Sequence, residues 1–336
     1  MQKRFPFFPQ TKMEFIKTLI RHRIFSAWLL WAFAMMTNAV IGVFIERHIK
    51  NRQIPVGGVL YDFGFDVLPF IPSKSLGFSL PDLCTLLPAT FTALALNIAF
   101  PPKLAVIILR RILCISAFAY LGRAVSVPLT LLPNPDSHCV FREKYPESNI
   151  WYVSLFVPFG ETITCNDVFF SGHTIPITCA MFTWIYYMRN WPICRFFGIL
   201  TSLLSLLGII VTHFHYTVDV FYGFIVTCIL WIIYHKSLQC PSILLTSFRG
   251  IIWLEKIDSV DYENPPKLFG MFPIQFSNDP RVVWSFPDHK PPPIAGGSRT
   301  QIALLLVIAL TLSPSWMALF THNDTHHFSH SKPGPV

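Results

Sequence analysis

The chain has 336 residues, of which 52% are hydrophobic and only 13% are charged. Soluble globular proteins carry about 25% charged residues, so this composition excludes an ordinary soluble domain. Several apolar runs are long enough to cross a hydrocarbon core of about 30 Å, which takes about 20 helical residues. The net charge of +8 comes from basic residues scattered between these runs, which favours a role in membrane orientation over nucleic-acid binding. We therefore expect an all-α, polytopic membrane helical bundle without a nucleic-acid partner.

The apolar runs predict six membrane spans that share one orientation. We expect them at about 24–45, 76–100, 112–132, 170–188, 196–212 and 220–234. Basic residues precede the first span and follow the second, fourth and sixth, which places these ends in the cytosol. Arg110 and Arg111 are assigned to a basic inner turn that sets this topology. Residues 1–23 are then a cytosolic segment and 24–236 a six-span domain, whose first span acts as its own anchor because no cleavage site is evident.

The C-terminal part divides into two segments. Residues 237–300 are rich in Pro, Lys and Asp and are expected to form a cytosolic tail or loop. Residues 301–336 contain an apolar run at 302–320 and a His-rich end. This run is either a seventh span, which we favour slightly, or a helix packed on the bundle. A seventh span would export Asn323, which begins the only Asn-x-Ser/Thr acceptor in the chain.

The eight cysteines show no CxxC or Cys/His spacing, so we expect neither a metal site nor a cofactor. Cys139 and Cys165 both fall in one predicted outer loop, where a disulfide is chemically allowed. The sequence leaves that pairing open. The segment 150–159 of the same loop is too short to span and is expected to lie in the interface or to re-enter.

Two polar motifs stand at the outer ends of apolar runs, where ionisable groups are costly unless they serve a site. One runs from Cys165 to Thr174 and the other from His213 to Val220. Ser171, Gly172 and His173 lie at the start of the fourth span, where unpaired backbone N–H groups and the helix dipole favour an anion. Asp167 either supports this site or caps the span.

The second motif supplies a second imidazole. His215 and Asp219 are four residues apart, so on a continuous helix the carboxylate could hold the imidazole in one tautomer. Two histidines and a carboxylate at an anion site suit phosphoryl transfer, because one imidazole can attack phosphorus while the other protonates the departing alkoxide. Arg123, in the third span, is either a phosphate ligand or the ion-pair partner of a buried acid.

Three further residues are assigned by the same reasoning. Asp62 and Asp66 are expected to be solvated loop carboxylates. His213 is either a supporting partner of the site or an interfacial residue without a role.

These motifs resemble those of the sphingomyelin synthase and sphingolipid synthase family, whose active site is similar to that of the lipid phosphate phosphatases. The family pattern C-G-D-x-x-x-S-G-H-T matches Cys165 to Thr174, except that Asn166 replaces glycine. The pattern H-Y-T-x-D-V is met in full from His215 to Val220. Arg110-Arg111 with Tyr120 and Arg123 resemble the R-R and Y-x-x-R of the third span, and 60–66 resembles the P-L-P-D-x-x-F-D loop weakly. The likeness covers about residues 15 to 240.

The resemblance implies an enzyme that moves a phospho-head group from a glycerophospholipid to the primary hydroxyl of ceramide and releases diacylglycerol. His215 would be the nucleophile that forms a phosphohistidine, Asp219 its assistant, and His173 the acid and then the base. The residues expected to bind substrate are Arg123, Ser171, Gly172, Asp167, Tyr216 and Thr217. Substrates would be membrane lipids, the site would face the lumen or the exterior in the Golgi or plasma membrane, and an oligomer is left open. The arginine that the phosphatases carry six residues before the nucleophile is absent, since Ile209 stands there.

We favour choline or ethanolamine over inositol as the head group. Sphingomyelin synthases are similar in having H-x-H-Y-T-x-D-V and in ending the sixth span with W-x-x-Y-H, as Trp231, Tyr234 and His235 do. Asn166 keeps ethanolamine in consideration. The alternatives are an inositol-phosphorylceramide synthase, a lipid phosphatase or phospholipase C that hands the phosphoryl group to water, and a non-catalytic transporter or scaffold.

Overall fold

A computed structural model describes residues 23–54, 57–73, 79–100, 102–136, 139–158, 160–189 and 191–239, together with Leu254. Its helices are α2 (Ile24–Arg52), α3 (Phe63–Val67), α4 (Leu80–Ala99), α5 (Pro102–Leu129), α6 (Ile150–Ser154), α7 (Thr174–Tyr187), α8 (Pro192–Val211) and α9 (Thr217–Gln239). The predictions for the N-terminal segment, for the tail (Leu254 apart) and for the run at 302–320 concern residues outside this part of the chain.

Five helices of the described part are long and apolar enough to cross a membrane, namely α2, α4, α5, α8 and α9. They confirm the prediction of an all-α, polytopic membrane bundle. The segment expected as the fourth span forms α7, which has only 14 residues. Most residues of α7 are buried, because it is surrounded by α4, α5, α8 and α9. It is therefore the central helix of the bundle rather than a lipid-facing one.

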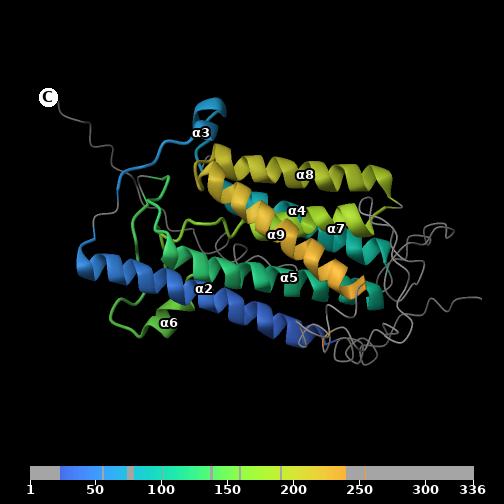
Figure 1. The fold of residues 1–336 in the computed structure, drawn as a ribbon, viewed down its shortest axis with the longest axis horizontal. Helices are drawn as coiled ribbons and strands as arrows, with labels where there is room; N and C mark the ends of the chain where they lie inside the picture. The colour runs from blue at the N-terminus through green and yellow to red at the C-terminus, as the bar shows by residue number, and fades with distance from the viewer. Residues whose placement is uncertain are drawn as a thin grey trace, which may run out of the picture.

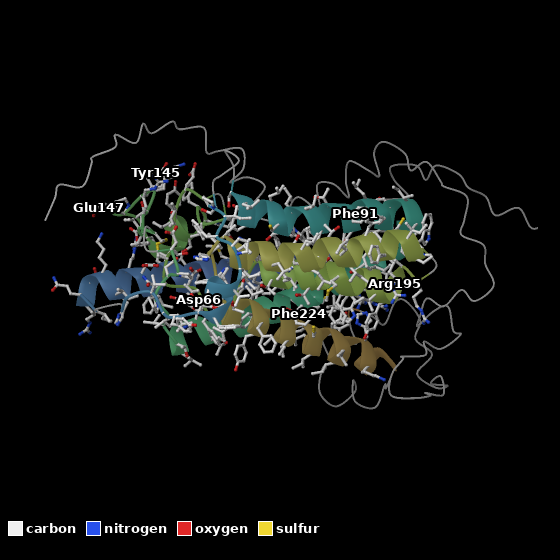
Figure 2. All side chains as sticks on the ribbon, turned by 90° about the horizontal axis from the view of Figure 1, so that it is seen from above. Asp66, Phe91, Tyr145, Glu147, Arg195 and Phe224 are labelled. Carbon is white, nitrogen blue, oxygen red and sulfur yellow. A yellow bond between two sulfur atoms is a disulfide. The ribbon has the colours of Figure 1, made fainter. Side chains whose placement is uncertain are left out.

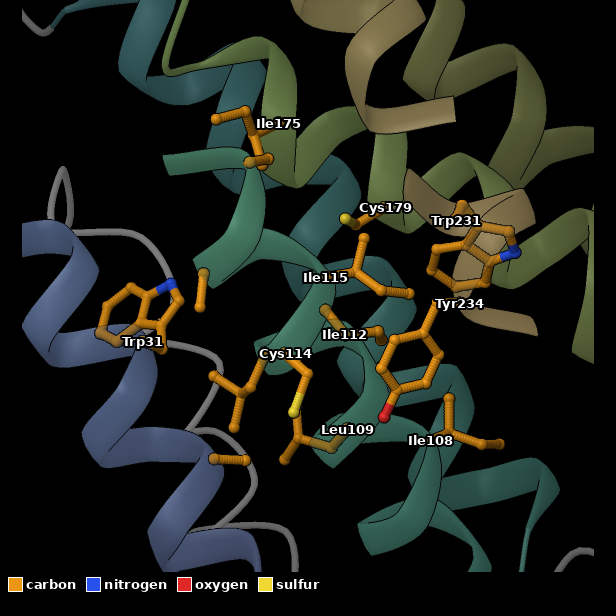
Figure 3. Packing of buried hydrophobic residues seen from close by; sticks show 14 of the residues in the cluster. Trp31, Ile108, Leu109, Ile112, Cys114, Ile115, Ile175, Cys179, Trp231 and Tyr234 are labelled. Carbon is orange, nitrogen blue, oxygen red and sulfur yellow. The ribbon is translucent and has the colours of Figure 1, made fainter. Parts of the chain in front are cut away.

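Most of the long helices run close to the long axis of the bundle, α9 crosses it obliquely, and α2 packs lengthwise on α5 (Figure 1). The core lies mainly between α2, α5, α7 and α9. Its members include Trp31 of α2, Ile112 and Ile115 of α5, Cys179 of α7 and Trp231 of α9 (Figure 3). Helix α5 is buried over most of its length, because α2, α7 and α9 pack around it.

The third span begins ten residues earlier than predicted. Helix α5 starts at Pro102, and proline is well tolerated in the first helical turn because its missing N–H has no intrahelical partner there. Arg110 and Arg111 therefore lie inside the helix and are buried, so their assignment to an inner turn is wrong. Nη1 of Arg111 lies 3.5 Å from the hydroxyl of Tyr187, to which it donates.

The ends of the helices bring all the predicted polar motifs to one end of the bundle. At this end α2, α5 and α8 finish and α4, α7 and α9 begin (Figure 1). Figure 2 shows Asp66, Tyr145 and Glu147 toward this end and Arg195 toward the other. We call it the site end.

The loop between α5 and α7 covers part of the site end. Cys139 and Cys165 form a disulfide in this loop, so the pairing that the sequence left open is present. The segment predicted to be interfacial contains the five-residue helix α6, which packs on α2. The end of this loop is the polar motif from Cys165 to Thr174, which we call the first histidine motif; the second is the motif from His213 to Val220.

Candidate active site

His173 and His215 lie side by side at the site end, with their ring centroids 5.7 Å apart. His173 comes immediately before the first residue of α7, and His215 lies in the turn between α8 and α9. The turn reverses the chain through His213, whose backbone is in the left-handed region with φ 51°. Two segments separated by some forty residues thus place two imidazoles together, as the motifs predicted.

Asp82 adds a carboxylate that the sequence reasoning missed. Its Oδ1 lies 3.4 Å from Nε2 of His173. Asp82 is in the first turn of α4, where Ser79 caps the helix and accepts the Asp82 N–H at 3.4 Å. The available signal was an acidic residue at the edge of an apolar run, which is costly without a partner. Asp82 can orient the His173 ring and pair with it when the ring is protonated.

His215 is buried, and its Nδ1 has no hydrogen-bond partner among the described residues. Burial lowers the pKa of His215 well below 6.5, and the positive charges of His173 and Arg123 lower it further, while an interaction with the Val168 carbonyl acts in the opposite direction. The neutral imidazole, which carries a lone pair, is the favoured form near neutral pH.

Asp219 does not hold His215 in the way that a continuous helix would allow. Helix α9 begins at Thr217, so His215 precedes it and the two residues do not share a helical face. Oδ2 of Asp219 accepts the Tyr216 N–H at 3.2 Å, and Oδ1 has no partner in the described part of the chain. Asp219 therefore caps its own helix with one oxygen and keeps the other available beside the site.

Arg123 fixes the loop that precedes His173. Its Nε donates to the Phe170 carbonyl at 2.7 Å, and its Nη2 donates to the Asp167 carbonyl and lies 3.4 Å from the Asp167 carboxylate. Nη1 donates to Asn38 of α2 at 3.2 Å. For Arg123 this arrangement favours the ion-pair partner over the phosphate ligand, and for Asp167 it favours support of the site over a cap of the helix. The Gly172 carbonyl is held separately by the Tyr120 hydroxyl at 3.1 Å.

Glu46 of α2, also missed from sequence, holds the start of the same motif. Its carboxylate is buried and accepts the backbone N–H groups of Cys165 and Asn166, the second at 2.6 Å. The Asn166 side chain donates to the same carboxylate at 3.0 Å. The residue that replaces the family glycine is therefore tied to α2, and in this structure it serves the loop.

Asp62 links the segment before α4 to the second histidine motif. Its Oδ2 accepts the Thr217 N–H at 2.6 Å, and its Oδ1 accepts the Gly64 N–H at 2.8 Å. The Tyr216 hydroxyl accepts the Leu60 N–H at 3.0 Å. The expectation that Asp62 is a solvated loop residue is wrong, because it caps α3 and α9 together. Asp66 is exposed as expected.

Gly64 shows how close this contact is. A Cβ at Gly64 would lie 2.0 Å from Oγ1 of Thr217, so only glycine fits without a shift. His213 lies beneath the same segment and stacks on Phe65 with ring centroids 3.9 Å apart, which gives it a supporting role.

Several buried polar atoms near the two histidines have no hydrogen-bond partner within the described residues. They are Oγ of Ser171, Oγ1 of Thr174, Nδ1 of His215 and Oδ1 of Asp219. The start of α7 and the first turns of α9 face each other here, since the Ser171 N–H donates to the Asp219 carbonyl at 3.2 Å. Buried polar groups are nearly always satisfied, so a cluster of exceptions indicates a place for polar atoms of a ligand.

Comparisons with known proteins find related sequences. Residues 164–236 match the family model described as the PAP2 superfamily C-terminal domain. The chain is 29% identical over 227 residues to sphingomyelin synthase-related protein 1 of Mus musculus, covering 65% of this chain and 45% of that protein. It is 36% identical over 122 residues to the phosphatidylinositol:ceramide inositolphosphotransferase of Trypanosoma cruzi, covering 35% of this chain and 36% of the relative.

A third relative, phosphatidylcholine:ceramide cholinephosphotransferase 1 of Caenorhabditis elegans, is 26% identical over 230 residues, which cover 64% of this chain and 48% of the relative. The chain is a distant relative of the sphingomyelin synthases and ceramide phosphotransferases. The matches span half the length of these three relatives or less. The PAP2 match runs from just before Cys165 to Lys236 and contains both histidine motifs.

Proposed function

We propose that this protein is a sphingolipid synthase that transfers a phospho-head group from a glycerophospholipid to ceramide and releases diacylglycerol. The observation that carries the proposal is the pair of imidazoles 5.7 Å apart beside two carboxylates and a cluster of unpartnered buried polar atoms. The similarity to ceramide phosphotransferases supports it. In the proposal His173, His215 and Asp219 are catalytic.

In the first half-reaction a ring nitrogen of neutral His215 attacks the phosphorus of the glycerophospholipid. The new N–P bond forms as the P–O bond to the diacylglycerol oxygen breaks. Protonated His173 gives its proton to that oxygen, which leaves as the alcohol. Burial of His215 favours the neutral form that this attack requires.

In the second half-reaction the primary hydroxyl of ceramide attacks the phosphohistidine. Neutral His173 takes the hydroxyl proton as the new O–P bond forms, and the N–P bond breaks with its electron pair returning to His215. Both histidines then have their starting protonation. In the proposal the hydroxyls of Ser171 and Thr174, which have no partner in the described part of the chain, donate to phosphate oxygens, and Arg123, Asp167 and Gly172 hold the loop that leads to them.

We propose choline or ethanolamine as the head group, from the similarity of the His213 to Val220 stretch to sphingomyelin synthases. The relatives include both a cholinephosphotransferase and an inositolphosphotransferase, so the head group is a separate question from the transfer. We also propose six crossings, in which α7 is added to the five candidate spans, a single catalytic unit at 24–236, and an active site that faces the non-cytosolic side of the Golgi or plasma membrane.

The test is expression in a host that lacks sphingomyelin, supplied with labelled ceramide, followed by identification of the product head group. A labelled phosphosphingolipid supports the transferase. Head group released only as water-soluble phosphate would identify a lipid phosphatase or phospholipase C instead, and neither product would indicate a scaffold or transporter.

The site assignment is tested in the same host. His215→Ala, His173→Ala and Asp219→Asn should each abolish the product while the protein stays in the membrane. His48→Ala, at an exposed position of α2, is the matched control and should retain activity. Transfer by the His215→Ala variant would eliminate the phosphohistidine mechanism.

A further inference from the structure

The segment 57–73, which contains α3 and which we call the α3 segment, displays large apolar side chains at the site end. Tyr61 is 79% exposed, Phe63 71%, Val67 62% and Phe70 59%. Exposed apolar patches of this kind mark a surface that is covered by something other than water. Asp66 faces outward among them.

The α3 segment is not a loosely held loop. Asp62 bonds to the backbone of Thr217, Tyr216 accepts from Leu60, and the Ile71 N–H donates to the Val211 carbonyl at 2.9 Å. Phe65 and Phe70 both contact the ring of His213. Because its polar backbone groups and the ring of Phe65 are tied to the turn between α8 and α9, the segment holds its exposed apolar side chains in a fixed outward position.

The neighbouring surfaces are those of membrane-spanning helices. The α3 segment contacts α8 and α9 (Figure 1). The exposed side chains of these helices include Leu204 and Leu207 near the end of α8 and Val218 and Phe221 near the start of α9. Because α8 and α9 are candidate spans, we expect these exposed apolar side chains to face lipid. The apolar surface of the α3 segment continues this lipid-facing surface to the end of the bundle.

We propose that the α3 segment is an interfacial anchor that lies in the membrane at the boundary between headgroups and acyl chains. Aromatic residues are favoured at this depth, and an amphipathic short element there buries its apolar side in lipid. The ionisable side chains at 57–73 are Tyr61, Asp62 and Asp66 alone, which suits lipid better than a charged protein partner. The occupant of this surface is lipid of the leaflet at the site end.

The anchor is bonded to Tyr216 and Thr217, which follow His215 directly. Its depth in the membrane and the position of the second histidine motif are therefore mechanically linked. This placement would bring the site to the level at which a phospholipid presents its phosphate. The proposal concerns where the segment lies, and it holds whether or not the protein proves to be a transferase.

The test is a depth measurement on the full chain in phosphatidylcholine vesicles. Cysteines outside the Cys139–Cys165 disulfide are replaced by alanine, and a fluorophore is attached at Phe63→Cys or, in a second variant, at Val67→Cys. Quenching by lipids that carry a nitroxide near the headgroup is compared with quenching by aqueous iodide. Leu204→Cys serves as the lipid-facing reference and Glu147→Cys, exposed at the same end, as the aqueous one.

We expect the labels at 63 and 67 to be quenched by the shallow nitroxide lipid several-fold more strongly than the label at 147, and by iodide more weakly. A pattern equal to that at 147 would overturn the proposal, because it would place the segment in water. Weak quenching by both agents would also overturn it, since the surface would then be covered by protein.

Discussion

The proposed nucleophile, His215, is enclosed by protein, and this sets a pH dependence. Its pKa lies well below 6.5 because burial disfavours the imidazolium, with His173 and Arg123 adding to the effect. The lowered pKa keeps the ring neutral as the pH falls through 6.5, and the lone pair needed for attack persists. We expect the acid limb of transfer rate against pH, measured in vesicles, to be centred below 6.5. An acid limb at or above 6.5 in protein that remains folded would contradict this assignment.

Phe214 contacts both histidines and offers a second prediction. Its ring meets those of His173 and His215 edge-on, with centroids 5.1 and 5.2 Å away, and 36% of the residue is exposed. An apolar side chain in this position excludes water from a phosphohistidine, which favours transfer over hydrolysis. Phe214→Ala should raise the ratio of hydrolysis to transfer about tenfold, a loss of about 1.4 kcal/mol of discrimination.

The measurement is the partition of labelled head group between ceramide product and water-soluble phosphate. Phe214→Leu is the matched control, because it keeps an apolar side chain over the site, and its ratio should stay close to that of the unaltered protein. An unchanged ratio in Phe214→Ala would show that other groups exclude water.

Among single residues, the sequence pattern predicted those that belong to polar motifs and missed those whose role depends on contacts with distant parts of the chain. His173 and His215 could be paired because each belongs to a polar motif that is expected at the same membrane face. Asp82 and Glu46 sit in long apolar runs with no motif around them, and Asn38 is a common polar residue of a helix. Their importance comes from partners distant in the chain, such as the Cys165 and Asn166 N–H groups that Glu46 accepts, and no local pattern encodes these.

Among the helices, α2 makes its contribution through Glu46. In Glu46→Gln an amide N–H group replaces one carboxylate oxygen. This N–H group would face the N–H groups of Cys165 or Asn166, which need an acceptor. We expect a loss of about 1–3 kcal/mol of stability, because a buried group is left unsatisfied. SDS-induced unfolding in mixed micelles measures it. Glu161→Gln, which removes an exposed ion pair with Lys144 from the same loop, should cost about 1 kcal/mol or less. Equal effects of the two substitutions would contradict the role of Glu46.

Hydropathy located the long apolar helices but not their ends, and it also predicted a span where the structure has the 14-residue α7. The thickness of the bilayer fixes the number of apolar residues that a crossing needs, and this signal is strong over a whole run. The ends depend on what the chain can pair with: α5 extends back to Pro102 over Arg110 and Arg111, while α7 begins only at Thr174 because residues 167–172 are bonded to Arg123 and Tyr120. A window of hydropathy contains no information about such partners.

For the whole molecule, the decisive property is that six helix ends meet at one end of the bundle. The chain runs along the bundle an even number of times, so α9 ends at the end where α2 begins. The region after Gln239 therefore starts on the side opposite the site. If the run at 302–320 crosses the membrane once more, Asn323 emerges at the site end. The chain has a single glycosylation acceptor, and its modification therefore reports on the number of crossings.

We expect Asn323 to be glycosylated when the protein is made in microsomes, because the run at 302–320 is long and apolar enough to span. The measurement is a gel-mobility shift that endoglycosidase removes and that Asn323→Gln abolishes. Pro146→Asn, combined with Asn323→Gln, creates an acceptor with Ser148 in the loop that joins α5 to α6 and serves as a positive control for the site end. If the variant with the acceptor at 146 is modified and the unaltered chain is not modified at 323, the C-terminal run lies on the cytosolic side. The bundle would then end with α9.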